Sequence, residues 1–234
     1  MSNNHNFQSF LFLGPKKMII SVHDELTFEE IYKHEKKIDN DKNEILFEYL
    51  QKFLDENILK VEKHLKNFIE SLILIIDDDR FLPIEISVKK NNSNHHLTKE
   101  SLTYSLNEAK DDCKKTHSEK KIIHIIIKNY KIDNKDYPSL PKNIKCDNFS
   151  IDIKFICIPN DIYDLLQKVL KKYQISIDRL ICSDYVLDFF TQNEHNIFKN
   201  TKYLIDGCNE NEVIFMDRSS KSMGFFEKFF KIFG

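Results

Sequence analysis

Clustered acidic and imidazole side chains are the residues of this sequence with the greatest capacity for chemistry. Asp77–Asp79 form an unbroken acidic run, and neighbouring carboxylates are the ligands that hard divalent cations prefer. The run closes an apolar stretch and precedes Arg80, and no second acidic cluster has a matching spacing, so we interpret it as a solvated turn at the end of a strand. His95 and His96 have no further ligands nearby and predict a flexible loop. The sequence therefore predicts no metal site.

The other candidate bases and nucleophiles also lack a recognisable context. His124 lies inside the apolar stretch IIHIII, which is typical of a buried or face-edge imidazole rather than of a catalytic base. The five cysteines show no CxxC spacing, and the N-terminus has no secretory pattern, so we expect reduced thiols in a cytosolic protein. No serine stands in a G-x-S-x-G context. We therefore predict a protein that is not an enzyme and has no catalytic residues.

Glycine is scarce, and this scarcity bears on nucleotide binding. The four glycines stand at positions 14, 207, 224 and 234. Loops that cradle phosphates need glycine where the backbone approaches the anion, and neither GxGxxG nor GxxxxGK[ST] can be assembled here. A formal net charge of −2, with lysines dispersed among acids, also provides no basic patch. We expect no cofactor and no nucleic-acid partner.

The strongest functional signal is the C-terminal segment MGFFEKFFKIFG, residues 223–234. On a helical projection its apolar side chains fall in one arc of about 160°, and its charged side chains fall outside that arc. An aromatic helix with lysines on its polar face is typical of a helix lying in a membrane interface; the alternative is a helix that packs on its own core or in a dimer. One such helix binds weakly, so stable attachment needs several copies. The predicted membrane-binding residues are Phe225, Phe226, Lys228, Phe229, Phe230, Lys231, Ile232 and Phe233.

The elements that carry these features follow from hydrophobic periodicity. Leucine, isoleucine and phenylalanine recur at three- and four-residue steps from 45 to 69 and predict an amphipathic helix. The polar stretch NNSNHH, residues 91–96, predicts a loop, and KYLID with EVIFMD predicts a final pair of strands. Further strands are expected at 10–13, 18–22, 29–38, 71–76, 83–91, 120–132, 149–159 and 175–181, with a short helix as the alternative for 29–38. Further helices are expected at 98–115, 160–173 and 184–190. This order predicts a mixed α/β (α+β) protein with a small subdomain in the middle of the chain.

In this order the sequence resembles FtsA, the family of actin-like bacterial cell-division proteins that anchor the FtsZ ring to the membrane. LFLGPKKMIISV is similar to the opening hairpin of that family, and KKIIHIIIKNYKID is similar to a strand of its inserted subdomain, the SHS2 module. KYLIDGCNENEVIF falls where the second phosphate loop belongs, and GFFEKFFKIFG falls where the membrane-targeting helix belongs. The resemblance implies a reduced actin-like first lobe with an inserted SHS2-type subdomain and a terminal amphipathic helix.

Several departures from the family pattern bear on ATP binding. In the first phosphate loop Gly14 is kept, but Phe12 occupies the acid position and Pro15 lacks a backbone N–H. In the second loop Asp206 and Gly207 are kept, but Glu210 and Glu212 would repel a triphosphate, and the second actin lobe is missing. We interpret Gly14, Asp206 and Gly207 as degenerate remnants that bind no nucleotide.

The resemblance and the C-terminal segment together predict a non-catalytic divisome adaptor on the cytoplasmic face of the inner membrane. Its partners would be the membrane surface and division proteins, such as FtsZ or late divisome components, and it could self-associate through the inserted subdomain. The alternatives are an actin-family ATP-binding protein with a divergent site and a pilus-assembly-type membrane adaptor. The predicted divisions are 1–67 and 161–216 for the first lobe, 68–160 for the interaction subdomain, 217–222 for a linker and 223–234 for the membrane helix.

Overall fold

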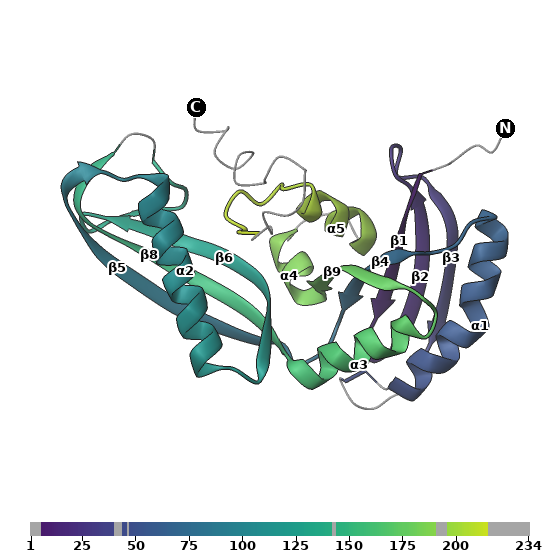
Figure 1. Cartoon of the computed structure of the whole chain (residues 1–234). Coiled ribbons are helices and arrows are strands. Elements are labelled where there is room, and N and C mark those ends of the chain that lie inside the picture. Colours follow the sequence, from purple (N-terminus) through teal and green to yellow (C-terminus); the bar gives the residue numbers. More distant parts are fainter. Residues whose placement is uncertain (1–5, 40–43, 46, 142–143, 191–195, 215–234) are drawn as a thin grey trace. The chain divides into compact units, whose positions relative to one another are not determined.

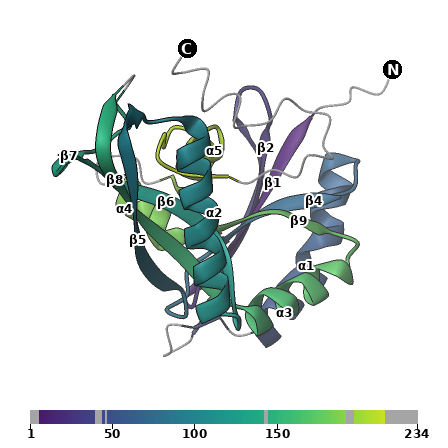
Figure 2. The ribbon, with the colours of Figure 1, turned by 60° about the vertical axis from the view of Figure 1, so that its left-hand side comes forward.

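The computed structural model describes residues 6–39, 44–45, 47–141, 144–190 and 196–214, and these residues form two compact units (Figures 1 and 2). The first unit comprises the chain up to Phe81 together with Pro159–Asp206. The second unit comprises Leu82–Ile158 and the residues from Gly207 onward. The fold is mixed α/β, as predicted. The strand at 71–76 belongs to the sheet of the first unit, although the predicted subdomain boundary at residue 68 assigned it to the insertion.

The first unit is built on a five-stranded sheet in the order β3-β2-β1-β4-β9. The predicted opening hairpin is confirmed, since β1 and β2 pair antiparallel around the turn and β3 continues as the antiparallel edge strand. β4 then adds parallel to β1, and β9 adds parallel to β4. The strands are β1 Phe7–Leu13, β2 Lys17–Asp24, β3 Glu30–Lys37, β4 Ser71–Ile76 and β9 Ser176–Cys182.

Helices cover both faces of this sheet because its central strands are apolar along nearly their whole length. Ile20 lies opposite His34, whose ring stacks on Phe53 of α1, so that α1 covers this face. Phe10 points to the other face and packs on Phe198 of α5. Continuous apolar strands of this kind are typical of sheets that are buried on both sides. The helices are α1 Phe47–Leu65, α3 Asn160–Lys171, α4 Ser183–Phe189 and α5 Ile197–Ile205.

The second unit is a four-stranded sheet in the order β5-β8-β6-β7 with one helix on it (Figure 1). Helix α2 begins after Thr98, whose hydroxyl accepts a hydrogen bond from the Ser101 N–H, as the predicted N-cap requires. Its buried face packs with alternate residues of β8 to form the core of this unit. The elements are β5 Leu82–His96, α2 Lys99–Thr116, β6 Lys120–Ile132, β7 Lys135–Tyr137 and β8 Lys145–Pro159.

Two predicted elements are wrong. The stretch 91–96 is not a loop, because β5 continues through it and pairs with β8 on both sides of a bulge at Ser93 and Asn94. These two residues have φ values of 47° and 59°, and the side chain of Asn91 accepts hydrogen bonds from the N–H and the hydroxyl of Ser93. Short polar side chains tolerate this left-handed conformation and supply local hydrogen bonds, so the composition of a bulge resembles that of a loop.

The second wrong prediction is the final strand pair. KYLI lies in α5, which begins where the Asn196 side chain accepts hydrogen bonds from the N–H groups of Phe198 and Lys199. EVIFMD was expected to form the partner strand. Its described residues form one isolated β-bridge, between Glu212 and Ile126 of β6. The N-cap sets the local conformation of 197–205, and the five apolar residues in this stretch do not reveal a period by themselves. The other predicted strands and helices with described residues are confirmed within a few residues.

A buried histidine, His23 of β2, packs against β1 of the opening hairpin and against α5. The ring of His23 stacks on Phe28 at 4.3 Å between centroids and lies 5.6 Å from Phe10 and 5.8 Å from Phe198. Its Nδ1 donates to the Phe28 carbonyl at 3.3 Å, which leaves Nε2 to accept from the Ser21 hydroxyl at 2.8 Å. This arrangement satisfies a neutral imidazole. Burial lowers the pKa of His23, while the hydrogen bond to Phe28 and the carboxylate of Glu30 oppose the shift in part.

The lowered pKa of His23 predicts acid lability of the first unit. Because the unfolded chain binds the proton more readily, the contribution of His23 to stability is complete above the ordinary histidine pKa of about 6.5. It is lost as the pH falls from that value through the lower pKa of the folded state. The free energy of unfolding, measured with urea, should fall for the wild-type protein when the pH is lowered from about 7.5 to about 5.5. We expect this decrease to be smaller for His23→Gln, which has no imidazole to protonate. The matched control is His96→Gln, at an exposed position of β5, which should keep the wild-type pH dependence. An unchanged slope in His23→Gln would contradict the prediction.

Candidate functional site

The carboxyl ends of the parallel strands form the site that the fold makes available. Gly14 follows β1, Asp77 follows β4, and Ser183 with Asp184 follows β9. The three strands are parallel neighbours, so these residues meet at one edge of the sheet. Open α/β sheets bind ligands at this edge. The structure thus places one of the predicted remnants, Gly14, where a phosphate-binding loop would be expected.

At Gly14 and Pro15 the turn offers no free backbone N–H to a phosphate. The Gly14 N–H donates to the Lys17 carbonyl at 3.0 Å within the hairpin, and Pro15 carries no N–H. The N–H of Asp77 is also used, since it donates to the Leu13 carbonyl at 2.8 Å. Phosphate loops depend on free N–H groups that point at the anion. The turn is therefore bonded as an ordinary hairpin.

Internal packing accounts for the glycine at position 14. A Cβ there would lie 2.9 Å from Cε1 of the Phe12 ring and 3.2 Å from Oδ2 of Asp77. Phe12 is buried, and Lys17 holds its ammonium nitrogen 5.5 Å from the centroid of that ring. The aromatic ring fills the space beside the turn, so that Gly14 is required by the close approach of Phe12 and Asp77.

The electrostatics of this edge also disfavour an anionic ligand. Burial raises the pKa of Asp77, and the charges of Asp184, Asp79 and Asp78 raise it further, while Lys17 acts against them. A triphosphate would add negative charge to this cluster of carboxylates and would be repelled. The structured part of the chain also contains no group of three or more His, Cys, Asp and Glu side chains arranged to hold a metal ion.

Asp78 corrects the interpretation of the acidic run as a solvated turn. The residue is 4% exposed, and its side chain accepts hydrogen bonds from Nε and Nη2 of Arg80 at 2.7 and 2.6 Å and from the Ile45 N–H at 2.9 Å. Burial alone would raise the pKa of Asp78, but the hydrogen bonds from Arg80 and Ile45 lower it on balance. Asp78 therefore fixes the segment before α1 to the end of β4. No simple spacing rule in the sequence marks this ion pair.

The second predicted phosphate loop has a different role in the structure. Asp206 ends α5 and accepts hydrogen bonds from Nζ of Lys202, one turn earlier, at 2.6 and 2.9 Å. Gly207 has a φ of 88°, the left-handed conformation that commonly terminates a helix. Asp206 and Gly207 thus form the end of a helix. The resemblance had implied a loop between two strands at this position.

The segment after Gly207 is held by the second unit. Asn211 and Val213 exchange backbone hydrogen bonds with Ile127 and Ile125 of β6, and the Val213 side chain is part of the core of this unit. Glu212 accepts a hydrogen bond from Nδ1 of the buried His124 at 2.8 Å. The prediction that His124 is a buried, hydrogen-bonded histidine is confirmed, and its partner is one of the acids expected to repel phosphate. This Glu212–His124 pair was not predicted, because the two residues are far apart in sequence.

The predicted linker and membrane helix, 217–222 and 223–234, lie outside the described residues. The same holds for every predicted membrane-binding side chain from Phe225 to Phe233. The described chain approaches this segment through Val213, one residue before its end at Ile214. No helix among the described residues is long and apolar enough to cross a membrane.

The cysteines are all described, and none forms a disulfide. Cys113, Cys146, Cys157 and Cys182 are buried, and Cys208 is exposed. Burial, with smaller contributions from Cys113, raises the pKa of the Cys157 thiol to about 12. A thiol with a raised pKa forms little of the reactive thiolate at neutral pH, so the buried cysteines behave as small core residues.

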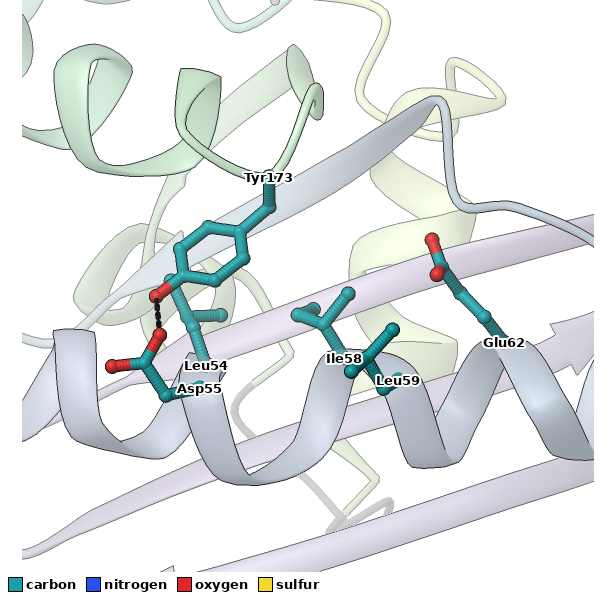
Figure 3. A pocket seen from close by; sticks show the side chains of 6 residues that line it. All are labelled: Leu54, Asp55, Ile58, Leu59, Glu62 and Tyr173. Atoms are coloured by element: carbon teal, nitrogen blue, oxygen red, sulfur yellow. Dashed lines mark hydrogen bonds between the residues drawn. The ribbon is translucent and has the colours of Figure 1, made fainter.

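The first unit also carries a shallow groove between α1 and the turn after α3 (Figure 3). Its volume is about 280 Å³. The hydroxyl of Tyr173 donates to Oδ1 of Asp55 at 2.6 Å across one end of the groove. Acidic residues and apolar side chains without a basic partner do not suit a phosphate ligand. The lining residues are Leu54, Asp55, Ile58, Leu59, Glu62 and Tyr173.

Comparison with known proteins gives only distant structural likenesses. No family model matches the sequence, and no curated protein matches it. The chain is similar to the cytoplasmic domain of EpsL, an inner membrane component of the type II secretion system of Vibrio cholerae, with 8% identity, a TM-score of 0.40, and coverage of 77% of this chain and 59% of that chain. It is also similar to the PilM–PilN type IV pilus biogenesis complex, with 6% identity, a TM-score of 0.48, and coverage of 79% and 49%.

A third similar structure is a Bacteroides thetaiotaomicron protein of unknown function with an actin-like ATPase fold. The identity is 13% and the TM-score 0.37, with 81% of this chain and 57% of that chain covered. The chain thus spans 49–59% of the length of these three structures. With TM-scores below 0.5, the three likenesses establish neither a family nor a function for this protein.

The ion pair between the buried Asp78 and the half-buried Arg80 leads to a prediction about stability. Replacing Asp78 with Asn removes a charge that satisfies Arg80 and the Ile45 N–H, and we expect a loss of about 2–4 kcal/mol in the free energy of unfolding. The loss should be largest near neutral pH, because the lowered pKa of Asp78 supplies stability above the ordinary aspartate range and loses it as the pH falls through the folded-state value. Chemical denaturation measures both effects.

Asp79 provides the matched control for this experiment, because it is exposed and adjacent in sequence. Asp79→Asn should change the free energy of unfolding by less than about 0.5 kcal/mol. Equal effects of the two substitutions would mean that Asp78 is not the residue that ties β4 to the start of α1.

Proposed function

We propose that this protein is a non-catalytic adaptor that attaches to a membrane surface through residues 223–234 and holds protein partners with its folded units. The observation that carries the proposal is the separation of Phe and Ile from Glu and Lys around this segment when it is placed on a helix. The absence of free backbone donors at Gly14 supports the non-catalytic part, since an actin-like lobe would bind phosphate there.

The position of the segment in the chain suits this role. Val213 is buried in the core of the second unit, so residues 215–222 are the only chain between that core and the Phe-rich segment. A membrane-bound segment would therefore hold the second unit close to the bilayer. Partners bound to that unit would be concentrated at the same surface.

The setting that we propose is bacterial cell division, with attachment to the cytoplasmic side of the inner membrane. It rests on the resemblance to FtsA in the opening hairpin, in the inserted subdomain and in the C-terminal segment. A pilus or secretion adaptor is the alternative setting; PilM–PilN and EpsL, which the comparisons name, belong to such systems. A fluorescent fusion in dividing cells separates the two, because a mid-cell band supports division, whereas polar foci or a diffuse signal contradict it.

The membrane proposal predicts the behaviour of a charged variant. Burying one Phe side chain contributes about 1.5–3 kcal/mol, so Phe226→Glu combined with Phe230→Glu should lower the liposome partition coefficient about a hundredfold or more. Co-sedimentation with vesicles that contain anionic lipid measures this change. The control adds the same two charges in the predicted linker, as Ser219→Glu with Ser220→Glu, and should retain most of the binding. Equal binding by all three proteins, or binding by none, overturns the anchor.

The structure of the Gly14 turn predicts the outcome of a nucleotide titration. Because the Gly14 N–H is bonded within the hairpin, Pro15 has no N–H and carboxylates lie nearby, we expect no saturable heat when ATP and Mg²⁺ are added to the 234-residue protein. A clear binding isotherm would instead support the rival reading as an actin-family ATP-binding protein with a divergent site.

A further inference from the structure

The second unit has one long sheet edge that the described residues leave open. β5 is the outermost strand in the order β5-β8-β6-β7 and bonds to β8 along its length. The opposite edge is closed in two places, because β7 pairs with the end of β6 and Asn211–Val213 pairs with its middle. An open edge strand presents a row of backbone donors and acceptors that another strand can use. The nature of the partner must come from the side chains of β5.

The side chains of β5 favour a second copy of the same strand. We propose that β5 pairs antiparallel with β5 of another molecule about a two-fold axis through Ser87. In this register Glu85 lies directly opposite Lys89 of the other copy, and Ile86 lies opposite Val88. The axis generates each of these pairs twice. Opposite charges and β-branched residues in directly opposed positions are the pairs that stabilise antiparallel strands.

The two faces of β5 remain consistent with this register. Val88 is buried in the core on the α2 side, and Ile84 and Ile86 pack against the same core while keeping part of their surface exposed. Glu85 and Lys89 lie on the other face, because side chains alternate along a strand. A two-fold axis perpendicular to the sheet leaves the α2-facing side of both sheets on the same side of the joined sheet. The apolar side of β5 would then continue across the seam, as would the charged side.

Lys89 is the residue whose surroundings point most directly to this partner. Glu85 already bonds to Lys128 of β6 at 2.8 Å, although its side chain is 60% exposed. Lys89 forms no ion pair with any described residue. In the paired arrangement Lys89 gains the carboxylate of Glu85 from the other copy, and that carboxylate retains room for a second cation.

An exposed aromatic side chain borders the same edge. Tyr104 of α2 is 66% exposed, and Nζ of Lys90 on β5 lies 5.1 Å from the centroid of its ring. Lys90 also bonds to Glu108 of α2 at 2.5 Å, which holds this side chain over the helix. Because Lys90 lies opposite Ile84 of the other copy, pairing brings Tyr104 to the seam, where it can cover that apolar side chain. The seam thus offers apolar burial as well as backbone hydrogen bonds.

Lysine and proline on an edge strand often serve to prevent pairing, and a monomer is the competing outcome. Here Pro83 lies outside the stretch from Ile84 to Lys90, so that it interrupts none of the pairs described. In the proposed register Lys89 lies opposite the Glu85 carboxylate of the other copy. Lys89 therefore favours this register of strand pairing and does not prevent pairing altogether. The inference goes beyond the proposed function and does not depend on it, but a dimer would present two C-terminal segments to one membrane.

The charge pair provides the first test, by analytical ultracentrifugation of the full-length chain. All proteins carry Phe226→Glu and Phe230→Glu, so that association through the C-terminal segment does not contribute. We expect a dimer that Glu85→Lys and Lys89→Glu each weaken at least about tenfold, since each places like charges opposite one another twice. The double variant Glu85→Lys/Lys89→Glu restores both pairs in reverse and should restore the dimer.

The control for charge reversal is Lys131→Glu, at an exposed position of β6, which should leave the dimer unchanged. Thermal unfolding of each variant confirms that the monomer remains folded. A monomer at all accessible concentrations overturns the proposal. A dimer that is insensitive to Glu85 and Lys89, or that the double variant does not restore, also overturns it, because the interface would then lie elsewhere.

Cysteine cross-linking tests the register independently. In a Cys208→Ser background, Ser87→Cys should give a rapid disulfide-linked dimer, because residues on the two-fold axis face each other across about 5 Å. Ser150→Cys is the matched control, because Ser150 lies beside Lys89 on the neighbouring strand β8. Its copy would be three strand spacings across the sheet and four residues along it, roughly 20 Å away, which a disulfide cannot span. Equal cross-linking of the two variants contradicts the proposed register.

Discussion

Parallel pairing of β1, β4 and β9 is the constraint on which the rest of the first unit depends. Parallel neighbours cannot be joined by a tight turn, so the chain must leave the sheet and cross over it each time. One connection contains α1, and the next contains the whole of β5 to β8 followed by α3. Because β1 and β4 are buried on both faces, helices are needed on each side. The second unit is therefore an insertion within a crossover.

The same constraint brings the carboxyl ends of these strands together at one edge of the sheet, and the local chemistry at that edge is unsuited to phosphate. Phe12 fills the space that an approaching anion would need, and the hairpin uses the N–H of Gly14. Asp78 forms an ion pair with Arg80, and Asp77 lies near other negatively charged carboxylates. The residues at this edge thus contact one another and stabilise the fold of the first unit.

The second unit combines two surfaces that an adaptor can use. One side of its sheet is closed by Asn211–Val213, which connects it to the C-terminal segment, and the other side ends in the open strand β5. The Glu212–His124 pair and the burial of Val213 hold the connecting stretch on β6. Membrane attachment and association through β5 would therefore act on a single folded unit. Such coupling raises the effective affinity of a weak membrane-binding segment.

The sequence by itself determined the elements whose pattern is long and regular. The period of α1, the alternation in β8 and the apolar runs of β1 and β4 identify the mixed α/β class, because burial on one or two faces imposes those patterns directly. The sequence also shows that Phe stands at position 12 and Pro at position 15, on either side of Gly14.

Only the tertiary structure decided the features that depend on contacts between distant residues. Ser93 and Asn94 form a bulge because β8 continues to pair beyond them, and the acidic residue Asp78 is buried because Arg80 and Ile45 meet it there. KYLI, with only a short apolar pattern of its own, is helical after the Asn196 cap, and Glu212 contacts His124 from 88 residues away in sequence. Local composition does not predict such contacts, because the packing and the hydrogen bonds that stabilise them form only when the chain has folded.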